Sequence, residues 1–205
     1  FTIKTSHNIK QRHLISGAQN SGKTFSLPSF IYGTSSYLDD SGDILHEALE
    51  YAGDKIMHII SAPGEKGSKS LPTETDNLKC YSYTTEGDEN SYKWSITAIS
   101  EFESLTDDII STKPYAVAID GLHAYYDHKM NIITEGAYLS GIPFEAKLYG
   151  AAHNTFGQFL NRLYHSSIDI VTCTTWEDWE AREDNVSAKP VTGAVTSSTP
   201  RYLWP

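Results

Sequence analysis

The sequence predicts an α/β fold, a three-layer sandwich with a mainly parallel central sheet. Short apolar runs closed by turn residues, which are typical of buried strands, occur at His13–Ser16, Ile56–Ser61 and Tyr115–Ile119. Segments with apolar residues at helical spacing lie between these runs, and strands that alternate with helices favour a parallel sheet. The 205 residues suffice for one full core and show no linker between two large domains. We therefore expect a single domain over residues 1–205.

The elements expected in the first half of the chain are separated by glycine, proline and polar residues. Asp43 precedes a helical pattern that stops at Gly53, as a helix with normal start and stop signals does. In order, we expect a strand at His13–Ser16, a helix from Lys23 to about Gly33, a helix over Ile44–Ala52, a strand at Ile56–Ser61, a loop over Ala62–Asn77 and a strand at Leu78–Thr84.

The second half contains the strongest strand signal of the chain. Tyr115–Ile119 is a continuous apolar run closed by Asp120 and Gly121, and Pro114 ends the helix before it. In order, we expect a turn at Gly87–Asn90, an amphipathic helix over Ile99–Ile110, this strand, an irregular and mobile segment at Gly136–Gly150, a helix over Phe156–Leu163 and a strand at Ile168–Thr174. Beyond Trp176 the chain turns polar.

The composition is that of a soluble globular protein, with 39% hydrophobic and 20% charged residues. No stretch reaches the roughly 20 apolar residues of a membrane span, and Phe1–Arg12 is polar. We expect a cytoplasmic protein with no membrane partner. Because Cys173 lies in an apolar run and Cys80 is its one companion, a disulfide framework is not expected. The lack of an initiating methionine and the abrupt end at Pro205 suggest trimming at both ends.

The net charge of −10 argues against general binding to DNA, which requires a local surplus of lysine and arginine. A nucleic-acid role would need a focused basic patch, a ring of subunits or residues outside this sequence. Arginine is scarce, and the chain holds Arg12, Arg162, Arg182 and Arg201.

One segment after the first strand matches the phosphate-binding pattern G-x-x-x-x-G-K-[ST] at every fixed position. Its glycines permit a tight backbone whose N–H groups point inward at a diphosphate. Lys23 would reach the β and γ phosphates, Thr24 would bind Mg²⁺ through its hydroxyl, and the positive end of the following helix would favour the anion. The alternative is a glycine-rich turn of similar sequence. The predicted ATP-binding residues are Gly17, Ala18, Gln19, Asn20, Ser21, Gly22, Lys23 and Thr24.

A phosphate-binding loop of this kind also needs an acidic residue at the end of a neighbouring strand, on the metal side. Asp120 supplies it, so Thr24 and Asp120 are the predicted metal ligands; a turn or helix cap is the alternative for Asp120. Residue 121 is glycine, so the Asp-Glu pair that polarises the attacking water in many ATPases is absent. We predict that Glu65 is the base, with Glu177 as second candidate and a solvated loop charge as the alternative. Lys23, Glu65 and Asp120 are thus the predicted catalytic residues.

Three other groups of residues suit a function less well. A γ-phosphate sensor and a capped strand end both explain Thr174, Thr175 and Glu177. Zinc binding is not expected, because the candidate ligands lack a fourth member and the two histidines are not an i, i+4 pair. These candidates are His123, Asp127 and His128. Four aromatic side chains could stack on a nucleotide base, but packing in the core or at its rim is the commoner use of such residues. They are Tyr125, Tyr126, Trp176 and Trp179.

In the order of these features the sequence resembles the RecA-like P-loop ATPases of phages, the AAA-type group that includes phage single-strand-annealing recombinases. The resemblance implies a RecA-like P-loop fold. It also implies a catalytic carboxylate after the strand that follows the P-loop helix, where Ala62-Pro-Gly-Glu65 is the nearest match. The matching stretches are Ser16–Thr24, Ala116–Leu122, Tyr149–Gly150 ahead of the helix Phe156–Leu163, Ile170–Thr175 with Glu177 behind it, and the tail Lys189–Gly193.

The motifs and the resemblance together predict an Mg²⁺-dependent ATPase of viral origin, located in the host cytoplasm. It would act in DNA recombination, annealing or replication, with single-stranded DNA favoured as partner. We expect a homo-oligomer in which a neighbouring subunit supplies an arginine to the site. Genome packaging, small-molecule phosphorylation and nucleotide-gated assembly with little turnover are the alternatives. The candidate arginine donors are Arg162, Arg182 and Arg201.

Overall fold

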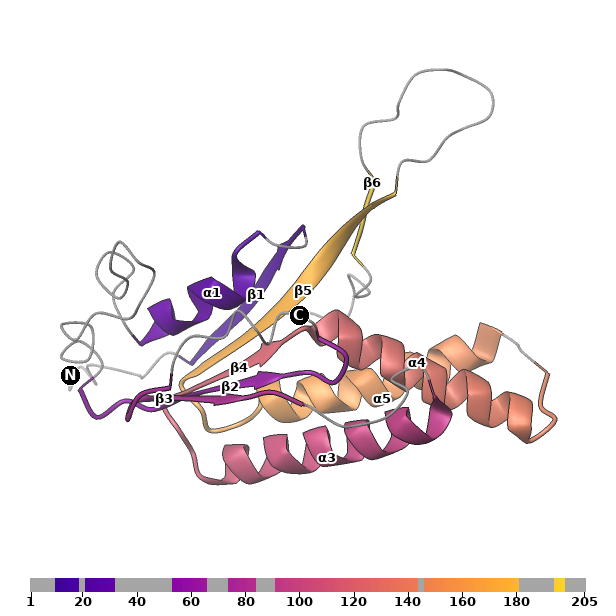
Figure 1. Ribbon diagram of the computed structural model, residues 1–205, viewed down its shortest axis with the longest axis horizontal. Helices are drawn as coiled ribbons and strands as arrows, with labels where there is room; N and C mark the ends of the chain where they lie inside the picture. The colour runs from indigo at the N-terminus through magenta and orange to yellow at the C-terminus, as the bar shows by residue number, and fades with distance from the viewer. Residues whose placement is uncertain are drawn as a thin grey trace, which may run out of the picture.

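The structure is a computed structural model, and it describes residues 10–18, 21–31, 53–65, 74–83, 91–143, 146–180 and 194–197. At residues 146, 177–180 and 194–197 only the backbone is described. In chain order these ranges form β1 (Gln11–Gly17), α1 (Lys23–Ser26), the 3₁₀ helix η1 (Leu27–Phe30), β2 (Met57–Ser61), β3 (Leu78–Tyr81), α3 (Tyr92–Ser111), β4 (Ala116–Asp120), α4 (Leu122–Leu139), α5 (Ala146–Tyr164), β5 (Ile170–Glu180) and β6 (Ala194–Ser197) (Figure 1).

Five of the described strands form one parallel sheet in the order β1-β5-β4-β2-β3. β1 pairs with β5 along its whole length, and β5 pairs on its other side with β4. β6 pairs antiparallel with the last four residues of β5, outside this parallel set. The predicted α/β class with a mainly parallel sheet is therefore confirmed.

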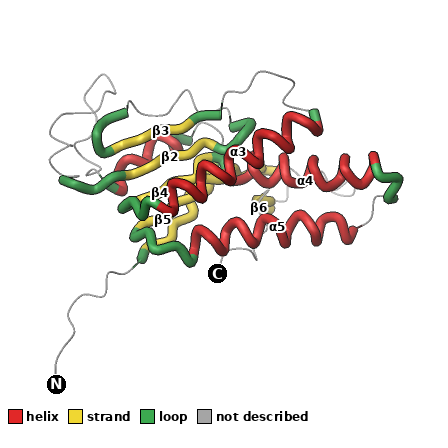
Figure 2. Tube along the Cα trace, turned by 90° about the horizontal axis from the view of Figure 1, so that it is seen from below, coloured by secondary structure: helices red, strands yellow, loops and turns green. Residues whose placement is uncertain are grey.

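Helices lie on both faces of the sheet. α3, α4 and α5 cover one face, and α1 with η1 lies on the other (Figures 1 and 2). Alternate residues of β4 join two separate cores, because Val117 and Ile119 pack under α3–α5 whereas Ala116 and Ala118 pack under η1. A strand buried on both faces reads as a continuous apolar run, which is why its sequence signal was so clear. The predicted three-layer sandwich is confirmed.

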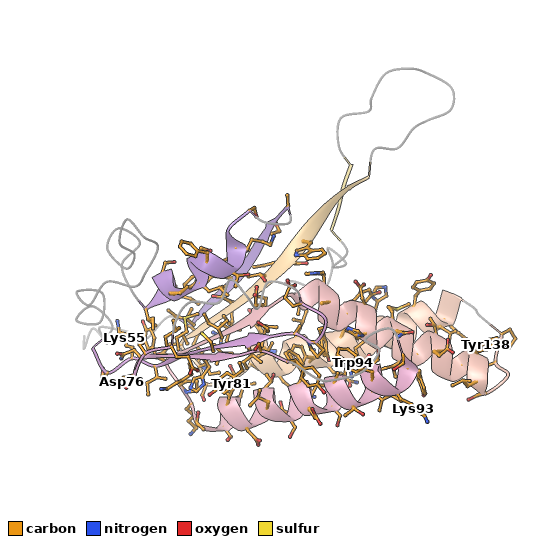
Figure 3. The ribbon with its side chains drawn as sticks, viewed as in Figure 1. Lys55, Asp76, Tyr81, Lys93, Trp94 and Tyr138 are labelled. Atoms are coloured by element: carbon orange, nitrogen blue, oxygen red, sulfur yellow. The ribbon has the colours of Figure 1, made fainter. Side chains whose placement is uncertain are left out.

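The segment after β4 differs from its prediction, because it is helical rather than irregular. α4 runs to Leu139 and α5 begins at Ala146, so most of the segment Gly136–Gly150 lies in two helices. A Cβ added to Gly136 would lie 3.1 Å from the hydroxyl of Tyr92, so the glycine lets α3 approach α4 closely. A glycine within a helix costs about 1 kcal/mol relative to alanine, and this low propensity favoured the wrong prediction. Tyr138, near the end of α4, is exposed (Figure 3).

The helix predicted from Lys23 to about Gly33 is shorter and changes type. α1 ends at Ser26, and η1 follows as a 3₁₀ turn that contains Pro28, which has no backbone N–H. The hydroxyls of Ser26 and Ser29 donate to the carbonyls three residues earlier, at 2.8 and 2.6 Å. Such local bonds compete with the α-helical ladder. The helix dipole expected to assist phosphate binding is therefore that of a single α-helical turn.

The last predicted strand, Ile168–Thr174, corresponds to β5, which continues further, to Glu180, and pairs there with β6. The polar composition beyond Trp176 had given no strand signal. The predicted helix over Ile44–Ala52, the turn at Gly87–Asn90 and the matching tail Lys189–Gly193 lie outside the described residues. Within the described ranges, none of the helices combines the length and the apolar character needed to cross a membrane.

Candidate functional site

The carboxyl ends of three parallel strands bring the predicted residues to one edge of the sheet. β1 ends at Gly17, which is in register with Trp176 of β5. β4 ends at Asp120, which is in register with Ser61 at the end of β2. Ligands of open α/β folds lie beyond this edge. The phosphate-binding loop, Asp120 and the segment that carries Glu65 therefore face the same region.

The loop from Gly17 to Thr24 leaves β1 and returns as α1. Gly22 caps α1 with φ +83°, a left-handed conformation that glycine adopts without steric cost. A Cβ on Gly17 would lie 3.0 Å from the hydroxyl oxygen of Ser21, so the loop closes tightly over its first residue. The two glycines of the motif thus occupy the positions that need them. Gln19 and Asn20, predicted to contribute backbone N–H groups, lie outside the described residues.

Lys23 is held inside the loop rather than extended into solvent. Its ammonium nitrogen donates to the carbonyls of Gly17 and Ala18, at 2.8 and 2.7 Å, and lies 3.4 Å from the Ser21 hydroxyl. Only 9% of the residue is exposed. The cation is therefore fixed at the loop that would hold an anion.

Thr24 and Asp120 are in direct contact although 96 residues separate them in the sequence. The Thr24 hydroxyl donates to both carboxylate oxygens of Asp120, at 3.0 and 2.9 Å. A second hydroxyl, that of Thr174 on β5, donates to Oδ1 at 2.6 Å and itself accepts from the backbone N–H of Gly121 at 2.9 Å. Thr174 therefore orients Asp120 and ties β5 to the end of β4, which favours the capped-strand interpretation of this threonine.

Asp120 is almost completely buried, with 1% of its surface exposed. Burial raises the pKa of its carboxyl above the usual value, although the hydrogen bonds from Thr174 and Thr24 and the charge of Lys23 act in the opposite direction. A carboxylate kept in this environment costs folding stability. Such a cost is common at sites where a charge serves binding or catalysis.

We expect Asp120→Asn to raise the free energy of unfolding at neutral pH. With a raised pKa, the folded protein holds the Asp120 proton at pH values where the unfolded chain has already lost it. Stability therefore falls as pH rises from about 3.9, the unfolded value, to the folded pKa, and the whole penalty persists above it. Asparagine has no such penalty. In denaturant titrations from pH 4 to 8 in EDTA, the free energy of unfolding of the variant should exceed that of the wild type by an amount that grows with pH. Equal stability at pH 7 would contradict this expectation.

Glu65 lies beside Gly121, the residue after Asp120, because β2 pairs with β4. The chain leaves β2 with the N–H of Ala62 donating to the carbonyl of Asp120 at 2.8 Å, and turns at Gly64, where φ is +79°. The Glu65 side chain, 5% exposed, then packs onto Gly121. A Cβ on Gly121 would lie 2.8 Å from Cγ of Glu65, so no other side chain fits at position 121 unless Glu65 moves. Glu65 thus occupies the space next to Asp120 that the missing glutamate would have used.

The turn before Glu65 rests on α3 and α4. Nε2 of His128 would lie 2.5 Å from a Cβ on Gly64, so the imidazole sits directly on this glycine. Nδ1 of His128 is 2.9 Å from the hydroxyl of Ser95, and its ring contacts the indole of Trp94, which is labelled in Figure 3. His128 therefore supports the Glu65 turn.

His123, which its sequence context suggested only as a zinc ligand, belongs to this site. It lies in the first turn of α4, with Nε2 at 3.4 Å from Oε2 of Glu65 and its ring stacked on Trp176 at a centroid distance of 4.0 Å. His128 contacts Ser95 instead, so the two histidines do not converge on one point. The position of His123, three residues after Asp120, is the sequence signal that could have assigned it to the strand-end site.

The remaining residues that the sequence suggested for the site lie away from the strand-end edge or outside the described residues. Tyr125 and Tyr126 are buried against aromatic residues of α3 and α5, so they pack in the core. Arg12 donates to backbone carbonyls near the amino ends of the strands, and Arg162 lies 3.3 Å from Asp107. Thr175 is buried in register with Ser16. Outside the description are the side chains of Glu177 and Trp179 and the whole of Arg182 and Arg201.

The residues of the site suit Mg²⁺ bound together with a triphosphate. Thr24 and Asp120 offer a hydroxyl and a carboxylate, which are the hard oxygen ligands that Mg²⁺ prefers. Within the described ranges, no group of three or more His, Cys, Asp or Glu side chains comes together as a complete protein cage. A site with few protein ligands is typical of Mg²⁺, which keeps waters and binds phosphate oxygens.

Comparison with known proteins gives structural neighbours only. No protein-family model and no curated protein matches the sequence. One solved structure with a similar arrangement is the assembled ATPase EscN of the enteropathogenic E. coli type III secretion system, with a TM-score of 0.48 and 12% identity over 80% of this chain and 37% of that chain. EscN in complex with its central stalk EscO gives a TM-score of 0.47 and 18% identity over 82% and 38%. This chain therefore spans less than two fifths of the proteins it resembles, and the likeness assigns no activity to it.

Proposed function

We propose that this chain is an Mg²⁺-dependent ATPase whose phosphate-binding loop is Gly17–Thr24. The observation that carries the proposal is the contact between the Thr24 hydroxyl and both carboxylate oxygens of Asp120. It joins the two parts of a metal–phosphate site that the sequence holds 96 residues apart. A glycine-rich turn of no function would not need a buried carboxylate at this position.

In this proposal the loop and Lys23 bind the triphosphate, while Thr24 and Asp120 hold Mg²⁺. The metal, when bound, neutralises charge on the phosphate oxygens. Lys23 already lies at the loop, and turning toward a phosphate exchanges its hydrogen bonds with the Gly17 and Ala18 carbonyls for charge-assisted ones. Thr174 keeps the Asp120 carboxylate in one orientation.

Glu65 is the proposed general base. A carboxylate 5% exposed and packed on Gly121, directly after Asp120, is well placed to take the proton of the water that attacks the γ-phosphorus. Its position also favours turnover over the alternative of a nucleotide-gated protein with little hydrolysis. That alternative was based on the missing glutamate at position 121, and Glu65 fills the corresponding space.

DNA and oligomerisation remain part of the proposal through the phage recombinase resemblance. Single-stranded DNA is the proposed partner, and double-stranded DNA would indicate the packaging alternative. An arginine from a neighbouring subunit is proposed to complete the site, because both described arginines are engaged away from it: Arg12 with backbone carbonyls and Arg162 with Asp107.

Phosphate release from ATP, measured at low salt with Mg²⁺ or EDTA, tests the proposal together with its partner. We expect hydrolysis that requires Mg²⁺ and that single-stranded DNA stimulates more than double-stranded DNA does. Tight ATP binding without hydrolysis in any of these conditions would favour the nucleotide-gated alternative. Failure to bind ATP at all would refute the site.

A further inference from the structure

A buried histidine contacts the proposed base from the side of α4. His123 is 4% exposed, and its Nε2 lies 3.4 Å from Oε2 of Glu65, which is within ion-pair distance but does not have the geometry of a hydrogen bond. The indole of Trp176 covers its ring from β5, with an angle of 27° between the two planes. The contact therefore joins three elements at the strand-end edge: α4, β5 and the segment after β2.

The surroundings keep this imidazole neutral. Among the described residues, the charged groups that act on it are the Glu65 carboxylate after β2, at 3.4 Å, and the Lys23 ammonium of α1. Burial, together with the charge of Lys23, lowers the pKa of His123 to about 4. A neutral imidazole has one N–H, and a carboxylate opposite Nε2 favours the tautomer that carries it there. Glu65 can then accept a hydrogen bond without being neutralised by an ion pair.

The other ring nitrogen has no structural use. Nδ1 of His123 is buried and has no hydrogen-bond partner among the described residues. Leaving a buried acceptor unpaired lowers stability, and such costs concentrate at functional sites. A residue selected only to fill space against Trp176 would not need two ring nitrogens here.

We propose that His123 is a positioning residue: a small adjustment of the two side chains from their present separation of 3.4 Å lets Nε2 donate to the Glu65 carboxylate, and this bond holds the carboxylate in the orientation of a base. The proposal rests on the proposed function, in which Glu65 takes the proton of the attacking water. His123 touches neither nucleotide nor metal in this scheme and acts through Glu65.

Two substitutions separate positioning from packing. His123→Phe keeps an aromatic ring against Trp176 and removes the N–H, whereas His123→Gln keeps an N–H donor and removes the ring. We expect the phenylalanine variant to lose about 10- to 100-fold in kcat, the usual effect of removing a group that orients a site residue, with KM for ATP unchanged. We expect the glutamine variant to retain more of the wild-type kcat. The reverse order, phenylalanine active and glutamine impaired, would overturn the proposal.

The double variant Glu65→Gln/His123→Phe shows whether the histidine acts through the glutamate. If it does, the double variant is no slower than Glu65→Gln alone, because nothing is left to position. A further full loss in the double variant would mean an independent role and would overturn the proposal. Thermal unfolding and ATP affinity of each variant verify that the fold persists.

The same variants distinguish a failure of the proposed base Glu65 from a failure of the positioning role of His123. If Glu65→Gln turns over ATP at the wild-type rate, Glu65 is not the base, and His123 has no base to position. A slow Glu65→Gln with a fully active His123→Phe leaves the proposed ATPase standing and removes the positioning role alone.

Discussion

Replacing Lys23 by alanine should abolish ATP turnover while the protein remains folded. The ammonium lies at the carbonyls of Gly17 and Ala18, inside the loop that would wrap the phosphates. Removing one preorganised donor to a developing negative charge costs about 10²- to 10³-fold in kcat. A cation that also binds the ground-state phosphates is expected to weaken ATP binding as well. Steady-state phosphate release at saturating Mg²⁺-ATP measures the first effect, and equilibrium binding of ATP measures the second.

Lys23→Met is the matched control for the fold, because it keeps a long unbranched side chain in the buried position and removes the ammonium group with its charge and its hydrogen bonds to the Gly17 and Ala18 carbonyls. We expect both variants to be equally inactive and to unfold near the wild-type temperature. A well-folded Lys23→Ala protein with normal hydrolysis would refute the phosphate-binding role of the loop.

Local sequence patterns predicted the loop and Asp120 because their chemistry is contained in short segments. The spacing of Gly17, Gly22 and Lys23 specifies one turn, and the structure places Gly22 in the left-handed conformation that the motif needs. Asp120 ends a strand buried on both faces, so its apolar signal was unbroken. Both features follow from neighbours within a few residues, which sequence alone displays.

The residues around Glu65 depend on contacts that no local pattern contains. Glu65 lies next to Gly121 because Ser61 is in register with Asp120, a pairing between two strands. Its place after the strand Ile56–Ser61 suggested Glu65 and the family resemblance supported it, but neither revealed that its side chain fills the space at Gly121. His123 was missed because α4 itself was not predicted. Its polar and aromatic residues give a weak helical pattern, and Gly136 lies near its end.

The β6 strand illustrates the same limit at the level of the fold. Polar residues give no strand signal by themselves, and the end of β5 becomes a strand through pairing with Ala194–Ser197. Pro28 shows the opposite case. Its effect on the helix after Lys23 is local and could have been recognised, because a proline at this position removes a backbone donor.

Replacing Glu65 by glutamine should lower kcat by about 10²- to 10⁴-fold, the usual contribution of a general base, while ATP binding remains nearly unchanged. Glutamine keeps the size and the packing on Gly121 but cannot take a proton from water. Single-turnover hydrolysis with prebound Mg²⁺-ATP isolates this step from nucleotide exchange. Glu177, whose side chain lies outside the described residues, is the second candidate. Wild-type turnover in Glu65→Gln combined with a slow Glu177→Gln would transfer the role of base to Glu177.

Gly121→Ala tests the same base without changing its chemistry. The added methyl group would lie 2.8 Å from Cγ and 2.9 Å from Cβ of Glu65, so the Glu65 side chain must move from its present position. Gly141→Ala is the matched control, because Gly141 also has a positive φ, of +69°, but its Cβ would meet nothing within 4 Å. Both substitutions place alanine in the left-handed region at a cost of about 1–2 kcal/mol. If displacement of Glu65 is what stops hydrolysis, Gly121→Ala loses turnover and Gly141→Ala keeps it, although both proteins are less stable than wild type.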